Sequence, residues 1–187
     1  MDSIMPLALQ DHTIDGVLLL DGVRFQDDRG FFAELYNQAR MPAELPPFVQ
    51  DNASLSLEKG VLRGLHFQKA PYAQGKFVTV LQGSIWDVLV DLRNASSTFG
   101  EAYGVELSAQ NKRQLYIPEG FAHGFVTLEA NTLVHYKTTA PYTPSHDSGI
   151  RWNDPTLAID WHLDGNSPIL SPKDEILPFF DSQATYF

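Results

Sequence analysis

The 187-residue chain contains no cysteine, which excludes disulfide bonds, thiolate nucleophiles and metal centres held by cysteine. It also lacks any apolar run near the roughly 20 residues that a membrane-spanning helix needs. Positive charge is scarce, because 13 Lys and Arg stand against 23 Asp and Glu and give a formal net charge of -10. Such a negative field repels nucleic-acid phosphates, so we expect neither a membrane nor a nucleic acid as a partner.

Several catalytic signatures are also missing. The sequence has no P-loop, no dinucleotide-binding fingerprint, no Gly-x-Ser-x-Gly elbow and no His-Glu-x-x-His. Proton transfer, ligand binding or an unusual metal site remain as candidate chemistries. The segment Met1 to Asp15 carries acids and no Lys or Arg, which is unlike a signal peptide, so a cytoplasmic location is expected.

Short apolar runs separated by Gly and Pro dominate the chain, a pattern typical of many strands and few helices. Ile85–Leu92 is the clearest strand. One of its faces is wholly apolar, and the other mixes apolar residues with Asp87 and Asp91. The predicted strands are Gly16–Phe25, Phe31–Tyr36, Phe48–Leu57, Val61–Gln68, Phe77–Leu81, Ile85–Leu92, Ala102–Leu107, Arg113–Ile117, Gly124–Leu128 and Leu133–Thr138.

Two segments indicate helix. Gln38–Leu45 is one candidate, and the other begins at Ser171, which is followed by a proline in the first turn and by Asp174 at the third position. With 43% hydrophobic and 12% aromatic residues, the chain can fill one core. We therefore expect a single all-β domain over residues 1–187, with short terminal helices and a C-terminal segment from about residue 152 packed on a closed barrel.

The stretch from Arg63 to Gln68, followed by Lys76, is the first cluster of polar residues that could carry chemistry. On a strand His66 and Gln68 share a face, whereas Arg63 has the opposite parity. A bulge at Gly64 would turn Arg63 to the same side as His66. Alternatively His66 is a satisfied core histidine and Arg63 a surface ion-pair partner, and this cluster taken alone favours that second interpretation.

The turn from Pro118 to His123 delivers a histidine at the start of a strand and looks like the second cupin motif. The stretch around His66 then looks like the first, but Gln68 stands where metal-binding cupins place another histidine. Lys76 lies in the region where an acidic ligand is expected, and a cation there works against a divalent metal. We therefore expect a cupin-type jelly-roll β-barrel that binds no metal.

Other candidates are weaker when taken by themselves. On the predicted strand Leu133–Thr138, Tyr136 lies on the same face as Val134. This position alone favours an ordinary aromatic residue of the barrel. A set of charged and amide residues is explained either by turn and edge chemistry or by a polar rim that binds a sugar or phosphate. This set comprises Asp28-Arg29-Gly30, Glu34 and Gln50-Asp51-Asn52.

Taken together, these stretches resemble the dTDP-4-dehydrorhamnose 3,5-epimerase family. The resemblance covers roughly residues 16 to 181, and the number, order and spacing of the matching motifs make it specific. The motifs are Asp28-Arg29-Gly30-Phe31-Phe32, Gln50-Asp51-Asn52, Val61–Gln68, Gln74-Gly75-Lys76, Phe99-Gly100, Leu107–Leu115, Ile117–Thr127, Tyr136-Lys137-Thr138-Thr139 and Gly149–Pro155.

The resemblance implies a role for each catalytic candidate. His66 would be the general base, Tyr136 the general acid, and Lys76 a cation near the ketone oxygen at C4. Asp174 would orient His66, although it also fits the acid of a helix cap. The resemblance further implies substrate-binding roles for Arg29, Glu34, Gln50, Asn52, Arg63, His123 and Lys173, a stacking role for Tyr142 on thymine, and a ligand role for Asp147.

The implied reaction inverts C3 and C5 of a dTDP-linked 4-keto-6-deoxyhexose through an enolate, with no cofactor and no metal, in a homodimer. A histidine with a reference pKa of ~6.5 suits the base because it is largely neutral at cytoplasmic pH. Four alternatives stay open: an epimerase acting at one carbon, a 3,4-ketoisomerase, a non-catalytic nucleotide-sugar binder, and a metal-dependent cupin.

Overall fold

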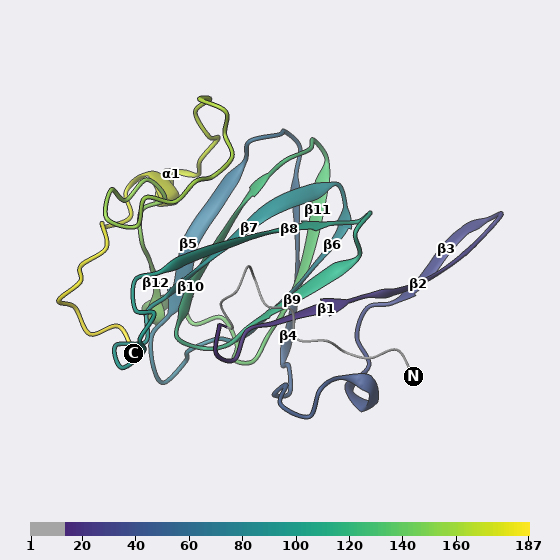
Figure 1. Cartoon of the computed structure of the whole chain (residues 1–187), viewed down its shortest axis with the longest axis horizontal. Coiled ribbons are helices and arrows are strands. Elements are labelled where there is room, and N and C mark those ends of the chain that lie inside the picture. Colours follow the sequence, from purple (N-terminus) through teal and green to yellow (C-terminus); the bar gives the residue numbers. More distant parts are fainter. Residues whose placement is uncertain (1–13) are drawn as a thin grey trace.

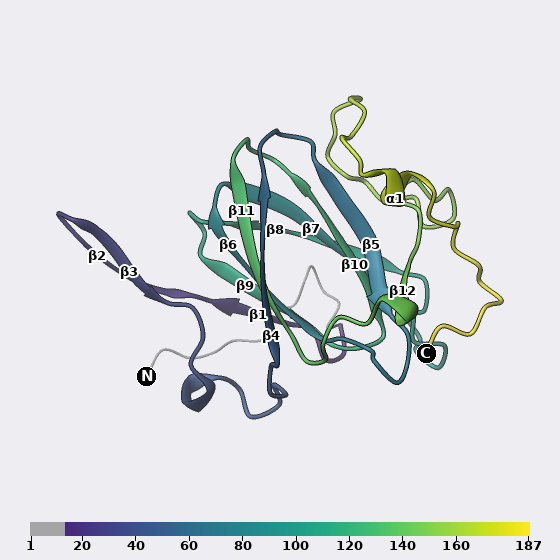
Figure 2. The ribbon, with the colours of Figure 1, turned by 180° about the vertical axis from the view of Figure 1, so that it is seen from behind.

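Two five-stranded antiparallel sheets face each other in the computed structural model, which describes residues 14–187 (Figures 1 and 2). The first sheet has the order β1 (Leu18–Asp21), β9 (Arg113–Ile117), β6 (Lys76–Gln82), β11 (Thr132–Thr138) and β4 (Gln50–Ser56). The second has the order β12 (Asp147–Gly149), β5 (Leu62–Gln68), β10 (Phe121–Thr127), β7 (Ser84–Asp91) and β8 (Ala102–Ser108). The predicted all-β barrel is confirmed.

Apolar side chains from both sheets fill the space between them, and among them Val78, Leu89 and Leu115 are fully buried. A second apolar cluster covers the outer face of the second sheet. There Trp161 and Leu157, from the C-terminal segment, pack with residues of β5, β7 and β10. The second sheet is therefore buried on both faces, which makes it a rigid wall for whatever lies between the sheets.

Burial on both faces changes the prediction for β7. Val88 and Val90 pack under the C-terminal segment, as the apolar face predicts, while Ile85 and Leu89 join the core between the sheets. Asp87 and Asp91 are completely buried too. The mixed face of this strand is therefore closed to solvent, and each carboxylate needs a partner inside the protein.

The predicted strand Gly16–Phe25 is interrupted in the structure. Gly22 donates its backbone N–H to Lys112 O at 2.8 Å, and a Cβ at this position would lie only 2.6 Å from the same oxygen. The chain leaves the barrel at Gly22 and forms β2 (Val23–Asp27), which pairs with β3 (Gly30–Glu34) in a hairpin. This hairpin projects away from the barrel (Figures 1 and 2).

Short elements account for the remaining differences. Only a 3-10 turn, η1 (Gln38–Arg40), forms in the predicted helix Gln38–Leu45, since Pro42 prevents its continuation, and the predicted helix is wrong. A second such turn is η2 (Pro144–His146), and the three-residue β12 was not predicted. The predicted terminal helix is confirmed as α1 (Pro172–Glu175). Strand β10 begins three residues before the prediction and so includes His123.

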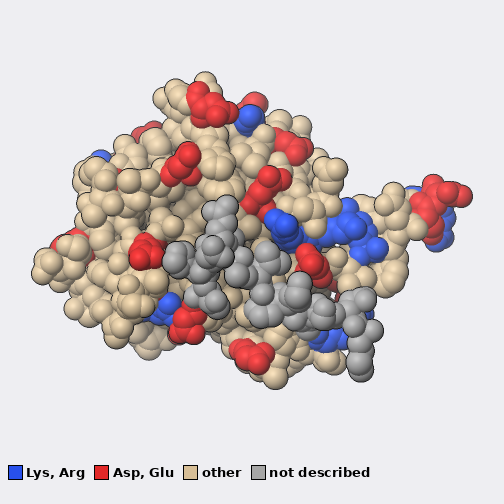
Figure 3. All heavy atoms as spheres, in the orientation of Figure 1, with Lys and Arg blue, Asp and Glu red and all other residues tan. Residues whose placement is uncertain are grey.

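Acidic side chains are spread across the face of the molecule in Figure 3, in keeping with the net charge of -10. On this face the Lys and Arg side chains gather mainly beside the base of the hairpin (Figure 3). Within residues 14–187, no helix has both the length and the apolar character needed to cross a membrane.

Candidate active site

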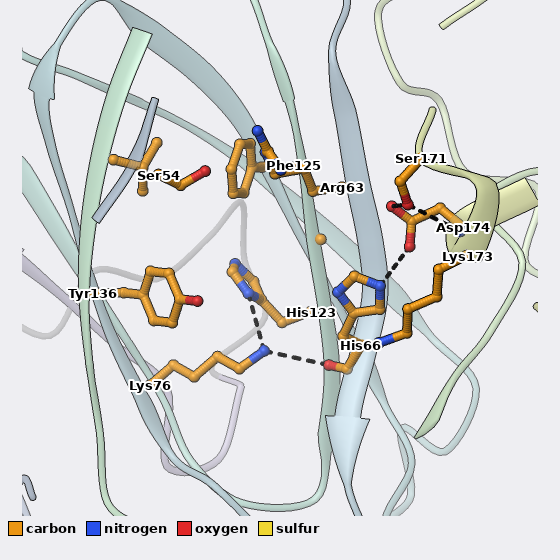
Figure 4. A pocket seen from close by; sticks show the side chains of 12 residues that line it. Ser54, Arg63, His66, Lys76, His123, Phe125, Tyr136, Ser171, Lys173 and Asp174 are labelled. Carbon is orange, nitrogen blue, oxygen red and sulfur yellow. Dashed lines mark hydrogen bonds and ion pairs between the residues drawn. The ribbon is translucent and has the colours of Figure 1, made fainter. Parts of the chain in front are cut away.

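A cavity of about 230 Å³ lies between the two sheets and is lined mainly by polar side chains. Tyr136 and Lys76 enter it from β11 and β6 of the first sheet. His66 and His123 enter from β5 and β10 of the second sheet, and Asp174 of α1 stands behind His66 (Figure 4). The lining residues are Ser54, Arg63, His66, Lys76, His123, Gly124, Phe125, Val134, Tyr136, Ser171, Lys173 and Asp174.

His66 and Asp174 form a close pair, with 2.5 Å between His66 Nε2 and Asp174 Oδ1. Asp174 also takes part in the N-terminal cap of α1, so it has both of the roles that the sequence left open. Ser171 Oγ accepts from the backbone N–H of Asp174 at 3.2 Å and donates to its Oδ2 at 2.9 Å. Burial acts to raise the pKa of Asp174, but the hydrogen bonds of His66 and Ser171 and the charge of Lys173 outweigh it, so the net shift is downward.

The ionised Asp174 determines the tautomer of His66. A carboxylate only accepts hydrogen bonds, so the ring proton of neutral His66 lies on Nε2. Nδ1 then carries a free lone pair, and Figure 4 shows this nitrogen directed into the cavity. In its neutral form His66 is thus a base whose lone pair faces the cavity.

Tyr136 faces His66 from the opposite wall. Its ring packs against the apolar core and its hydroxyl is directed into the cavity (Figure 4). Burial raises the pKa of Tyr136, and the positive charge of Arg63 opposes this only in part. The phenol therefore stays protonated at neutral pH and can act as a proton donor.

Lys76 lies between the two histidines of the cavity. Its ammonium donates to His66 O at 3.3 Å and lies 3.5 Å from His123 Nδ1. Burial lowers the pKa of Lys76 to about 8, although the charges of Asp87 and Asp147 act to raise it. The side chain remains a cation at neutral pH, in a place where a developing negative charge could be stabilised.

Arg63 and His66 share the cavity because β5 bulges between them. Across β10, His123 pairs with His66 and Phe125 pairs with Arg63, so β5 has one residue more than its partner. Gly64 permits this, since its φ is +119° and a Cβ there would lie 2.6 Å from the Cα of Gly124. The predicted bulge is confirmed.

The interpretation that this cluster favours when taken alone, with Arg63 as a surface ion-pair partner, is wrong. Within residues 14–187 Arg63 forms no salt bridge. Its Nη2 lies 3.3 Å from Ser56 Oγ and 3.4 Å from Leu55 O, both long contacts with neutral groups. The guanidinium therefore has capacity left to bind an anion.

A second polar group surrounds the loop that carries Tyr142. Tyr142 donates its hydroxyl to Asp147 Oδ2 at 3.0 Å, and the ammonium of Lys173 forms an ion pair with the same oxygen. Gln50 Oε1 accepts the backbone N–H of Tyr142 at 2.8 Å, and Gln50 Nε2 donates to Asn52 Oδ1 at 2.8 Å. These five predicted residues form one connected network, and Lys173 joins it to the cavity.

Two predicted binding residues do not reach the cavity of their own chain. Arg29, at the tip of the projecting hairpin, has an 89% exposed side chain and pairs with Asp27 at 2.5 Å. Glu34 lies at the hairpin base and pairs with Arg40 at 3.1 Å. The hairpin extends away from the barrel that holds His66 (Figures 1 and 2).

Gln68 and Asp87 have roles that sequence reasoning missed. Gln68 donates to Tyr72 O at 2.7 Å and to Pro141 O at 3.2 Å, and accepts from the N–H of Thr143 at 2.6 Å, so it anchors the Tyr142 loop. Asp87 lies 2.8 Å from His123 through Oδ2 and Nε2. The alternation along β7 could have identified Asp87, because it shares the barrel-facing side with Leu89.

The donor set of the cavity does not suit a metal. Among the described residues, no group of three or more His, Asp or Glu side chains is arranged to hold an ion. His66 and His123 have the Lys76 ammonium beside them, and a cation there opposes binding of a divalent ion. Metal-free chemistry stays a prediction, and metal analysis of active protein would test it.

Comparisons with known proteins agree with this geometry. A family model described as dTDP-4-dehydrorhamnose 3,5-epimerase matches residues 11–182. The epimerase of this name from Salmonella typhimurium is 50% identical over 171 residues, covering 90% of this chain and 92% of that protein. The crystal structure of the Bacillus anthracis epimerase with TDP and PPi bound is 53% identical, with a TM-score of 0.84, covering 88% of this chain and 94% of that one.

The Legionella pneumophila structure, in complex with dTDP-4-keto-L-rhamnose, is 45% identical with a TM-score of 0.81 and covers 91% of this chain and 96% of that one. These neighbours confirm the predicted cupin-type jelly roll. The matches extend over nearly the whole length in sequence and in fold. This chain belongs to the dTDP-4-dehydrorhamnose 3,5-epimerase family.

Proposed function

We propose that this protein is an isomerase that converts dTDP-4-dehydro-6-deoxy-D-glucose into dTDP-4-dehydro-L-rhamnose, in dTDP-L-rhamnose biosynthesis. It inverts C3 and C5 by moving protons. The observation that carries this proposal is the opposition of His66 and Tyr136 across one cavity (Figure 4). Each comes from a different sheet, so a sugar ring between them has a base on one face and an acid on the other.

Inversion proceeds in two proton transfers at each carbon. His66 Nδ1 takes the proton from C3 or C5, and the C–H electron pair moves into the C4 carbonyl to form an enolate. Tyr136 then donates its proton to the same carbon from the opposite face. Water returns a proton to Tyr136 and removes one from His66 before the next inversion, so atoms and charges balance.

Asp174 and Lys76 support the charges that appear in these steps. Asp174 holds the His66 tautomer and stabilises the imidazolium that forms. Lys76 offers a positive charge to the enolate oxygen in a partly buried site, where such stabilisation is strong. Positioned acid and base groups add roughly 10²- to 10⁴-fold each. No cofactor is required by this scheme.

The nucleotide binds on the Tyr142 side of the cavity. Tyr142 is 54% exposed and its ring can stack on thymine, and the Gln50–Asn52 and Asp147–Lys173 pairs border it. Arg63 and Lys173 line the cavity and supply positive charge for the diphosphate. His123 lies deeper, beside Lys76, where it contacts the sugar.

The protein works as a homodimer in which each hairpin reaches the partner's cavity. Three observations support this. The hairpin exposes Phe25, Phe31 and Phe32 by 57%, 58% and 69%. Edge strand β4 exposes Leu55 by 54% and has a free edge to be covered. Finally, Arg29 lies away from the cavity of its own chain, so Arg29 and Glu34 can bind substrate only in the cavity of a second copy.

Solvent deuterium incorporation tests the reaction directly. Incubation with dTDP-4-keto-6-deoxyglucose in D₂O should give product deuterated and inverted at both C3 and C5, whereas His66→Ala should show neither change. Exchange at one carbon would identify a single-site epimerase. A keto group moved to C3 would identify a ketoisomerase. Tight binding without turnover by wild type would identify a non-catalytic binder. The cytoplasmic location stays a prediction.

A further inference from the structure

Asp87 is a buried carboxylate on the far side of His123 from Lys76. Its side chain is 0% exposed, and its Oδ2 lies 2.8 Å from His123 Nε2. Its other oxygen, Oδ1, has no hydrogen-bond partner among the described residues. A buried carboxylate with an unpaired oxygen is costly, so its presence at this place calls for a role.

The contact with Asp87 determines where the proton of His123 lies. A carboxylate accepts but does not donate, so neutral His123 carries its proton on Nε2. Burial lowers the pKa of His123, which keeps the ring neutral even though Asp87 acts to raise that pKa. Nδ1 is therefore a lone-pair acceptor, and it lies 3.5 Å from the Lys76 ammonium (Figure 4).

Lys76 is then held at two of its three N–H groups. One N–H is directed to His66 O at 3.3 Å and a second to His123 Nδ1. The third remains available to the cavity that the side chain lines. A neutral amine has only two N–H groups, whereas the ammonium has three, so only the ammonium can donate to both of these acceptors and keep an N–H for the cavity.

We propose that Asp87 is a positioning residue: it locks the His123 tautomer and supplies the negative charge that keeps Lys76 an ammonium with one N–H free for the enolate oxygen. The catalytic part of this inference rests on the proposed function. The arrangement of Asp87, His123 and Lys76 does not.

Other charges also face Lys76, and their signs are mixed. Asp147 of β12 acts to raise its pKa and Lys173 of α1 acts to lower it. Among the groups that oppose the effect of burial on Lys76, Asp87 has the largest influence. His66 and Arg63 of β5, Tyr136 of β11 and Asp174 of α1 also line the cavity. Removing the charge of Asp87 should therefore lower the pKa of Lys76 most.

The variant Asp87→Asn tests the proposal. An asparagine amide can donate to His123 Nε2, which moves the ring proton to Nδ1 and turns a donor toward Lys76. We expect the alkaline limb of the kcat–pH profile to move down by about one pH unit, which lowers kcat near pH 8 by about fivefold. KM should change by less than about twofold, since substrate contacts remain.

Asp91→Asn is the matched control. Asp91 is another fully buried carboxylate of β7, but it binds Arg93, Ser96 and Thr98. Asp91→Asn should lower the free energy of unfolding without moving the alkaline limb of the kcat–pH profile. If Asp87→Asn leaves the limb in place, or if both variants move it alike, the proposal is overturned.

Imidazole ¹⁵N NMR of the unliganded protein measures the His123 tautomer and does not depend on turnover. His123 should be protonated at Nε2 in wild type and at Nδ1 in Asp87→Asn. A wild-type Nδ1–H tautomer would overturn the proposal even if the enzyme is active. Conversely, an Nε2–H tautomer in a protein without turnover would contradict the proposed function alone. If Asp87→Asn does not fold, the His123 tautomer of the wild-type protein still decides, because it needs no variant.

Discussion

His66 and Asp174 are 108 residues apart in the chain, yet His66 Nε2 lies 2.5 Å from Asp174 Oδ1. The strand β5 presents the imidazole, and a four-residue helix held by Ser171 presents the carboxylate. This contact leaves Nδ1 of His66 as the lone pair that faces the cavity (Figure 4). Catalysis by His66 therefore depends on a segment at the far end of the chain.

Asp174→Asn should reduce kcat by roughly 10²-fold or more, because an amide can donate to Nε2 and place the ring proton on Nδ1, where the base must act. The substitution is nearly isosteric, so KM should change little. Steady-state kinetics with the dTDP-4-keto sugar measure both constants.

Ser171→Ala is the control for this variant. It removes the helix cap and the bond to Asp174 Oδ2 while leaving the His66–Asp174 contact. It should cost about 1 kcal/mol of unfolding free energy. Activity losses of equal size in the two variants would show that Asp174 acts only through helix stability.

Tyr136→Phe should separate exchange from inversion. His66 can still remove a proton and return a deuteron to the same face, so solvent deuterium should enter C3 or C5 of the substrate. Inversion should fall by roughly 10²-fold or more, since the acid on the opposite face is missing. NMR of the sugar in D₂O follows both events. Loss of exchange together with inversion would make Tyr136, rather than His66, the group that removes the proton.

Lys76→Met should stabilise the protein at neutral pH. Burial lowers the pKa of Lys76 to about 8 from its ordinary value of 10.5. Between these pH values the unfolded chain holds a proton that the folded protein releases, so the unfolding free energy of wild type rises with pH across this window. The methionine variant should be more stable by roughly 3 kcal/mol at pH 7, and its advantage should vanish above about pH 10.5.

Urea unfolding at fixed protein concentration, repeated from pH 7 to above the ordinary lysine value, measures this difference. Lys59→Met, at an exposed position, controls for the loss of a cation. An advantage of Lys76→Met that stays constant with pH would mean that better packing, and not the buried charge, is responsible.

Arg29→Ala and His66→Ala should each inactivate the proposed homodimer and restore activity to one another when mixed. If Arg29 serves the partner's cavity, a mixed dimer contains one intact site that has a wild-type hairpin and a wild-type His66. Turnover after mixing and subunit exchange should approach a quarter of wild type for random pairing by this counting of sites.

No recovery on mixing, with dimers verified by light scattering, would place Arg29 and His66 in the same site. Phe32→Asp supplies a second check, because a charge on the exposed hairpin should favour the monomer. Ile176→Asp introduces the same charge at a 77% exposed position outside the hairpin and should leave the assembly unchanged.

The alternation of apolar and polar residues predicted most strands, because it shows which side chains share a face. Alternation places Asp87 on the same face as Leu89, but it could not predict the partner of Asp87, His123, because it does not say what lies opposite a face. The break at Gly22 also escaped prediction. That glycine is needed only because Lys112 O, in a turn distant along the chain, lies 2.6 Å from where a Cβ would stand.

The sequence by itself determined the available chemistry: no cysteine, a histidine and a tyrosine on separate strands, a lysine where a metal ligand would stand, and a glycine that permits a bulge beside Arg63. Only the tertiary structure decided that His66 and Tyr136 face each other, that Asp174 holds His66 and that Arg29 stands apart from its own cavity. Local patterns set the face and conformation of each segment, whereas pairing of distant strands sets which faces meet.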